Sequence, residues 1–152
     1  MRRRAFLRSA GAGIAAVALP ASAQSSFLPR RDVAALVAEV TGGATPDRVG
    51  IAMEIPSLAE NGNSVPLRIR VDSPMTATDH VRAIHVFSER NPRPRIAVFH
   101  FGPAAGRAEI VTRVRLAVEQ KVVVLASLSG GRYRLAEAEV VVTSAACIDE
   151  GV

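Results

Sequence analysis

Cys147 is the only cysteine in the sequence, so any thiol chemistry must use it. If the last strand continues to the end of the chain, Cys147 shares a face with Val141 and is a small buried hydrophobe. Against this, Asp149 and Glu150 follow closely, and chain ends are rarely packed deeply. An unpaired thiol near the end of an exported chain is typical of a free, reactive group. Position alone leaves both interpretations open.

The three histidines are His80, His85 and His100. His85 and His100 fall in strand-like runs on either side of a proline-containing turn, so a hairpin could bring them together. A metal site needs a third ligand and outer partners that orient the ligands, and the spacing indicates neither. We therefore expect histidines of a sheet, hydrogen-bonded or solvated, with no metal and no cofactor.

The remaining polar residues do not form a catalytic pattern. The acids Glu54, Asp72, Glu89 and Glu109 are scattered, and no pair stands out as a general acid and base. The glycines of residues 102–106 lack the lysine and the strand–helix context of a phosphate loop, and no serine lies in a nucleophile elbow. The sequence therefore indicates a protein that is not an enzyme by itself.

Composition and charge narrow the class of protein further. The chain has 152 residues, 49% hydrophobic and 22% charged, which fits one globular domain. Its net charge of +5 comes largely from four arginines in the first eight residues; beyond residue 23 the 15 basic residues stand against 14 acidic ones. A nearly neutral domain with 4% aromatic residues and no tryptophan is unlike a nucleic-acid binder.

The first 23 residues read as an export signal. Arg3-Arg4-Ala5-Phe6-Leu7-Arg8 is similar to the twin-arginine consensus, and a weakly apolar stretch over Ala10–Leu19 follows it. Ala21-Ser22-Ala23 then has the small residues of a cleavage site. The apolar stretch is shorter than the roughly 20 residues of a membrane span. We expect a periplasmic protein starting near Gln24, exported by the twin-arginine pathway, with an ordinary Sec signal as the alternative.

Apolar periodicity predicts one helix followed by strands. The helix has Asp32 as its N-cap, the glycine pair 42–43 as its stop, and an apolar stripe of Val33, Leu36, Val37 and Val40. After it the apolar period changes to two, which predicts seven strands: Ile51–Ile55, Val65–Val71, Val81–Phe87, Ile96–Phe101, Ala108–Leu116, Val122–Ser127 and Tyr133–Thr143. Turn residues separate them. This pattern favours an all-β, antiparallel sandwich, with the helix over one end or edge.

Two runs of this sandwich carry few charges. Val122–Leu125 and Val140–Val142 are β-branched or aliphatic, and such runs on open sheet edges promote aggregation unless a partner covers them. As central strands they would need no partner. The sequence pattern leaves the two placements open.

From about residue 49 to Cys147 the chain resembles the SoxY family, the sulfur carriers of bacterial thiosulfate oxidation. The matching stretches are 59–66, 71–75, 84–87, 91–95 and 112–117, including Asn61-Gly62-Asn63 and Asn91-Pro92-Arg93-Pro94. The resemblance implies an immunoglobulin-like β-sandwich that pairs with a SoxZ-like sandwich subunit. It also implies that Cys147 covalently holds sulfur intermediates and presents them to separate periplasmic enzymes, with no membrane or nucleic-acid partner.

The resemblance divides the chain into a signal (1–23), an N-terminal segment with the helix (24–48), the sandwich (49–143) and an arm (144–152). In the family the cysteine stands in a terminal Gly-Gly-Cys-Gly-Gly, whereas here alanines precede Cys147 and Ile148, Asp149 and Glu150 follow it. Alanines stiffen the backbone relative to glycine, and the acids disfavour a thiolate. The alternative function is a structural or binding sandwich related to SoxY that no longer carries sulfur.

Overall fold

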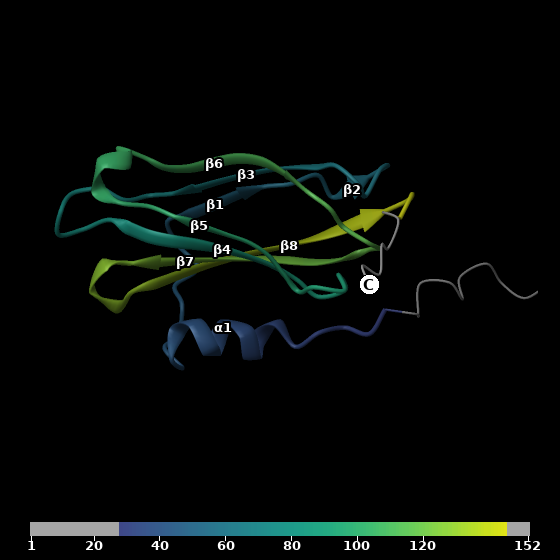
Figure 1. The fold of residues 1–152 in the computed structure, drawn as a ribbon, viewed down its shortest axis with the longest axis horizontal. Coiled ribbons are helices and arrows are strands. Elements are labelled where there is room, and N and C mark those ends of the chain that lie inside the picture. Colours follow the sequence, from purple (N-terminus) through teal and green to yellow (C-terminus); the bar gives the residue numbers. More distant parts are fainter. Residues whose placement is uncertain (1–27, 146–152) are drawn as a thin grey trace, which may run out of the picture.

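Two facing β-sheets and one α-helix dominate the described part of the protein (Figure 1). The computed structural model describes residues 28–145. Its elements are α1 (Val33–Thr41), β1 (Ile51–Glu54), β2 (Leu58–Ala59), β3 (Val65–Val71), β4 (Val81–Ser88), β5 (Arg95–His100), η2 (Pro103–Ala105), β6 (Ala108–Val114), β7 (Gln120–Leu128), η3 (Ser129–Gly131) and β8 (Tyr133–Val142). Within residues 28–145, no helix is long and apolar enough to cross a membrane.

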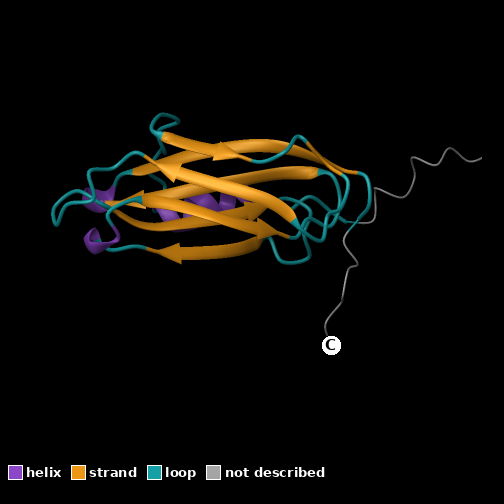
Figure 2. Ribbon diagram, turned by 90° about the horizontal axis from the view of Figure 1, so that it is seen from above, coloured by secondary structure: helices purple, strands orange, loops and turns teal. Residues whose placement is uncertain are grey.

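The strands form a three-stranded sheet, β1-β3-β6, and a five-stranded sheet, β2-β8-β7-β4-β5. All paired strands are antiparallel except β2, which runs parallel to β8. The view from above shows the strands of the two layers running along the long axis, with loops at both ends (Figure 2). The predicted immunoglobulin-like β-sandwich with a short helix is confirmed. The seven predicted strands are all present, and β2 is an eighth that the sequence pattern does not reveal.

The core lies between the sheets and follows from strict alternation. β3 buries every second residue, and its inward side chains pack with those of its neighbour β6 and meet those of β4 and β7 across the layer. The largest fully buried members are Val65, Leu67, Ile69, Val81, Ile84, Val86, Leu116, Val122, Val124 and Val140. The outward positions of β3 carry Pro66, Arg68 and Arg70, which are exposed, so the three-stranded sheet turns a polar face to solvent.

The helix forms for local reasons that the sequence predicts correctly. The Asp32 side chain accepts a hydrogen bond from the Ala35 backbone N–H at 3.1 Å, which caps the first turn. Gly42 ends the helix with φ 64°, a left-handed conformation that glycine adopts without steric cost.

The position of the helix differs from the prediction. Instead of an end or edge, α1 covers the outer face of the five-stranded sheet, where Val33 packs with Phe87, Val123 and Leu125 (Figure 1). These three side chains point away from the main core and are at most 4% exposed. Strands β4 and β7 are therefore apolar on both faces, and the second face needs a cover of its own.

The two uncharged runs are not open edges. Val122–Leu125 lies in β7, between β8 and β4, so its interpretation as an edge is wrong. At the end of β8, Val141 and Val142 pair with Leu58 and Ala59 of the short strand β2. The two residues of β2 are enough to cover Val141 and Val142, because the uncharged run at the end of β8 is itself short.

We expect Leu125→Ala to lower the free energy of unfolding by about 2–5 kcal/mol, because the residue is fully buried between the sheet and α1 and its removal leaves a cavity. Urea unfolding followed by circular dichroism measures the change. The control is Val98→Ala, at a position that is 41% exposed, where we expect a loss of about 0.5 kcal/mol or less. Equal losses in the two variants would contradict this account of the helix-side cluster.

Candidate functional site

Three loops and the end of β8 meet at one end of the sandwich (Figure 1). The loops are residues 60–64 between β2 and β3, 89–94 between β4 and β5, and 115–119 between β6 and β7. These loops contain much of the sequence on which the family resemblance depends. Their turn residues predict three loops but do not predict that the loops lie together. We call this end, with residues 143–145 that leave it, the arm root.

A ladder of backbone hydrogen bonds fixes the arm root. The Thr143 N–H donates to the Ala59 carbonyl at 3.0 Å, and the Gly62 N–H donates to the Ser144 carbonyl at 2.9 Å. The Leu116 N–H in turn donates to the Gly62 carbonyl at 2.8 Å. Gly62 thus joins the departing chain to the β6–β7 loop, and it is buried. The chain is held in place as far as Ser144.

Asn91 joins the other two loops through its side-chain amide. Its Nδ2 donates to the Arg115 carbonyl at 2.7 Å, while its Oδ1 accepts from the Ala117 N–H and from Gln120 Nε2, both at 2.9 Å. Gln120 is only 4% exposed, and its Oε1 accepts from the Arg90 N–H at 2.9 Å. Gln120 Nε2 also donates to the Val118 carbonyl at 3.1 Å. A buried amide stabilises a structure only when its hydrogen bonds are satisfied, and the amides of Asn91 and Gln120 bond to each other and to four backbone groups.

The predicted site residue itself, Cys147, lies outside the described residues. What the structure places is its point of attachment, because Ala145 is the last described residue and stands just beyond the ladder. Sequence reasoning missed Asn91 and Gln120 as positioning residues. The only available signal was the asparagine and proline content of residues 91–94, which indicates a turn but not its partners.

The histidines do not form a ligand set. In the β4–β5 register His85 stands opposite Val98 and His100 opposite Ala83, so the two are diagonal rather than paired. His80 lies outside the strands, with its Nδ1 3.1 Å from the Thr76 carbonyl. Within residues 28–145, no group of three or more His, Cys, Asp or Glu side chains is arranged to hold a metal ion.

The surroundings of His85 shift the pKa of its imidazole. Its ring stacks on that of Phe87, with centroids 6.0 Å apart and planes 5° apart. Burial lowers the pKa of His85 below the ordinary 6.5, and the charges of Arg95 and His100 lower it further. A neutral imidazole stacked on an aromatic ring beside α1 is a packing group rather than an acid or base at the arm root.

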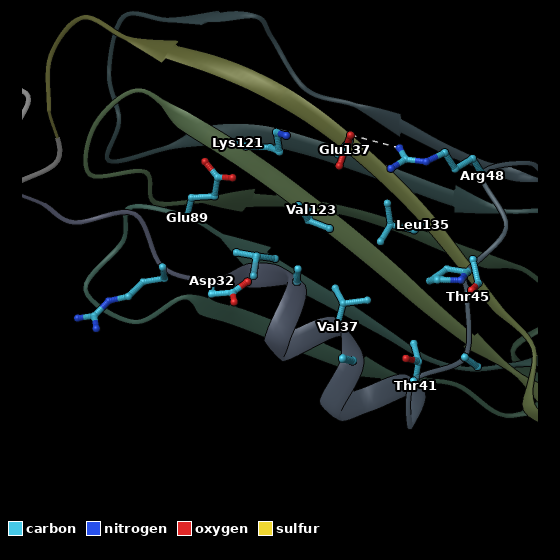
Figure 3. Close-up of a pocket in the computed structure, with 17 residues that line it drawn as sticks. Asp32, Val37, Thr41, Thr45, Arg48, Glu89, Lys121, Val123, Leu135 and Glu137 are labelled. Carbon is cyan, nitrogen blue, oxygen red and sulfur yellow. Dashed lines mark ion pairs between the residues drawn. The ribbon is translucent and has the colours of Figure 1, made fainter.

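A groove of about 460 Å³ runs along the seam between α1 and the outer face of β7 and β8 (Figure 3). Val37, Val123 and Leu135 give it apolar walls. On its rim Arg48 and Glu137 form an ion pair at 3.2 Å. Apolar walls with a paired charge at the rim are typical of a helix packed on a sheet.

We expect Asn91→Ala to lower the free energy of unfolding by about 1–3 kcal/mol, because it leaves the Ala117 N–H without its acceptor and removes one of the two acceptors of Gln120 Nε2. Urea unfolding measures the loss, and amide hydrogen exchange at residues 115–119 locates it. Asn63→Ala is the matched control, since Asn63 is exposed. Unchanged exchange in the Asn91 variant would show that the loops hold together without this amide.

The lowered pKa of His85 predicts a pH dependence of stability. Because the folded-state pKa lies below 6.5, the unfolded chain binds more protons than the folded one once the pH falls below about 6.5. Stability therefore falls with acidification through that window, and His85→Gln loses less stability between about pH 7 and pH 5 than the parent protein. Unfolding curves at several pH values provide the measurement. The same pH slope in both proteins would argue against the assignment.

Comparison with known proteins shows which family this chain resembles in sequence and in structure. Residues 37–147 match the family described as sulfur oxidation protein SoxY. The structure of the sulfur carrier protein SoxY from Chlorobium limicola f thiosulfatophilum superposes with a TM-score of 0.59 at 28% identity, covering 73% of this chain and 96% of that one. No curated protein sequence matches the chain.

Superoxide reductases share the fold. The neelaredoxin of Ignicoccus hospitalis matches with a TM-score of 0.55 at 16% identity over 60% of this chain and 79% of its own, and a putative superoxide reductase of Thermotoga maritima with 0.51 at 19% over 60% and 84%. At such identities the likeness concerns the β-sandwich alone. The family match covers most of the chain, including both the arm root and Cys147. The chain belongs to the SoxY family of sulfur oxidation proteins.

Proposed function

We propose that this protein is a periplasmic sulfur carrier, which holds sulfur intermediates covalently on Cys147 during thiosulfate oxidation. The observation that carries the proposal is the family match through Cys147 together with the geometry of the arm root. Hydrogen bonds hold the chain up to Ser144, and the only thiol follows three residues later. A carrier needs this combination of a fixed attachment point and a nearby reactive group.

The distance that the arm covers supports the carrier role. From Ser144, the last residue that the hydrogen bonds hold, to Cys147 there are three residue steps, which span at most about 10–11 Å when extended. That reach takes the thiol off the sandwich surface and into a shallow cleft of another protein. A thiol fixed on a strand of the sandwich would require the enzyme to approach the whole sheet.

Loading is an oxidation that this chain does not perform alone. An S–S bond forms between the Cys147 sulfur and a sulfur atom of the substrate, the thiol loses its proton, and two electrons pass to an electron-accepting partner enzyme. Asp149 and Glu150 disfavour the thiolate by like charge, so the group that removes the proton belongs to the enzyme visited. The protein is a covalent substrate carrier rather than an enzyme.

The proposal includes a second subunit and an export route. A SoxZ-like β-sandwich forms a heterodimer with this chain, while contacts with the sulfur-oxidising enzymes are transient. Within residues 28–145, β5 pairs only with β4 and exposes Val98, and this open edge supports a stable partner. Residues 1–23 direct export by the twin-arginine pathway; they lie outside the described residues.

Mass spectrometry of the periplasmic protein from thiosulfate-fed cells tests the carrier function. We expect a sulfur adduct on the tryptic peptide that follows Arg134, which contains Cys147. A thiol reductant removes the adduct, because it is held by an S–S bond, and Cys147→Ser abolishes it.

The same variant provides the functional control. In a thiosulfate-oxidising host without a second carrier, Cys147→Ser stops oxidation, whereas Cys147→Ser accompanied by wild-type protein does not. An unmodified thiol, together with a wild-type oxidation rate in the variant, would leave the structural or binding sandwich as the function.

A further inference from the structure

Two exposed apolar residues lie side by side on the five-stranded sheet, at the end from which the arm leaves. Leu58 of β2 stands directly opposite Val141 of β8 in the strand register, and the two residues are 54% and 48% exposed. The next pair in the register, Ala59 and Val142, packs with the core between the sheets, so Leu58 and Val141 face outward. We call Leu58 and Val141 the apolar pair.

The other exposed large apolar residues of the described chain have different neighbours. Val98 stands opposite His85, Val111 stands opposite Arg68, and Val49 lies outside the strands. Single apolar residues are normal on a protein surface, whereas adjoining ones at a sheet edge favour association with another molecule. The apolar pair is therefore the exposed feature that best fits a protein contact.

The helix leaves the apolar pair uncovered. On the outer face of the sheet α1 packs near Leu135, and Val141 lies six residues further along β8, toward β2 (Figure 1). A hollow of about 120 Å³ beside Val141 has Lys121 and Glu139 among its lining residues. Neither of these side chains forms an ion pair with any residue in 28–145. An apolar centre beside unpaired charges of both signs is the usual composition of a protein interface.

The arm leaves the sandwich next to the apolar pair. Ser144, the last residue that hydrogen bonds hold, comes three positions after Val141, and Cys147 comes three positions after Ser144. Each of these steps spans at most about 10–11 Å. An interface at the small end of the specific range, about 600 Å² per partner, is roughly 28 Å across. A protein that takes the thiol into a cleft therefore also covers surface around the arm root.

We propose that the apolar pair is the docking surface for the enzyme that loads Cys147. An apolar rim beside the cleft of that enzyme packs on Leu58 and Val141, and polar groups of the enzyme meet Lys121 and Glu139. The loops at this end instead expose charged residues such as Arg93 and Arg115, and charged residues are depleted at interface centres.

The inference rests on the proposed function and deepens it, because it names the surface by which the enzyme recognises its carrier. It leaves the edge of β5, at the opposite side of the same sheet, to the second subunit. A contact centred on two half-exposed side chains is small. The enzyme therefore releases the carrier readily after each transfer, as transient complexes do.

Site-specific photo-cross-linking in a thiosulfate-oxidising host tests the surface. With benzoylphenylalanine in place of Leu58, or separately of Val141, the full chain cross-links to a periplasmic enzyme whose deletion stops thiosulfate oxidation. Val111, which is 69% exposed on the other sheet, is the matched control position and gives no such product. A cross-link to a second copy of this chain or to the SoxZ-like subunit instead overturns the proposal, and so do equal yields at all three positions.

Two neutral substitutions measure the strength of the contact. L58Q with V141T leaves the charge unchanged and removes apolar surface. With the purified cross-linked enzyme and thiosulfate, we expect the KM for the carrier to rise on the order of tenfold at unchanged kcat, which corresponds to about 1.4 kcal/mol of lost binding. V111T leaves the KM unchanged. The same KM in the L58Q/V141T variant and the parent protein contradicts the proposal. The cross-linking result does not depend on the stability of this variant.

The Cys147→Ser variant separates the docking surface from the carrier function. Cross-linking from position 58 persists in this variant, because the apolar pair and not the thiol makes the contact. Loss of the cross-link overturns the docking surface. In the parent protein, a sulfur adduct on Cys147 without a cross-link to the enzyme overturns the docking surface alone. A cross-link without a sulfur adduct overturns the carrier function alone.

Discussion

The five-stranded sheet is apolar on both faces, and the rest of the structure depends on covering both of them. Along β7, Val122 and Val124 point into the space between the sheets, while Val123 and Leu125 point the other way. The three-stranded sheet covers the first pair and α1 the second. Because apolar burial is the main favourable term in folding, the helix is an integral layer of the domain and not an appendage.

The arm root is built on the same strand. β7 begins at Gln120, where the buried sheet ends and the chain must turn, so its side-chain amide enters the interior edge at 4% exposure. An unsatisfied amide there would be costly, and the Asn91 side chain and the Val118 carbonyl supply acceptors for it. Satisfying this one group draws the β4–β5 and β6–β7 loops together, and the second of these holds Gly62 and, through it, Ser144. Hydrogen bonds thereby connect the buried start of β7 to residues 143–145, from which the C-terminal arm leaves the sandwich.

The same sandwich serves different chemistry in other proteins, as the likeness to superoxide reductases shows. Here the described residues offer no cluster of metal ligands, and the polar groups at the arm root hydrogen-bond to backbone rather than converge on a cavity. These hydrogen bonds hold the loops and residues 143–144 in fixed positions. Rigid support for a reactive group from packed elements and satisfied hydrogen bonds is a general requirement of functional sites.

The sequence by itself determined the class of fold, the helix with Asp32 and Gly42 at its ends, and seven of the strands, because caps and alternation are local signals. It also showed that Cys147 is the only thiol. Only the tertiary structure decided that β7 is an interior strand, that α1 covers a sheet face, and that Leu58 and Ala59 form a strand at all. These depend on which distant segments pair: β2 is two residues long and pairs with a strand about 80 residues later, and Asn91 contacts residues 24 to 29 positions away. Such contacts leave no periodic trace in the sequence, because their energy comes from burial that exists only after the sheets have closed.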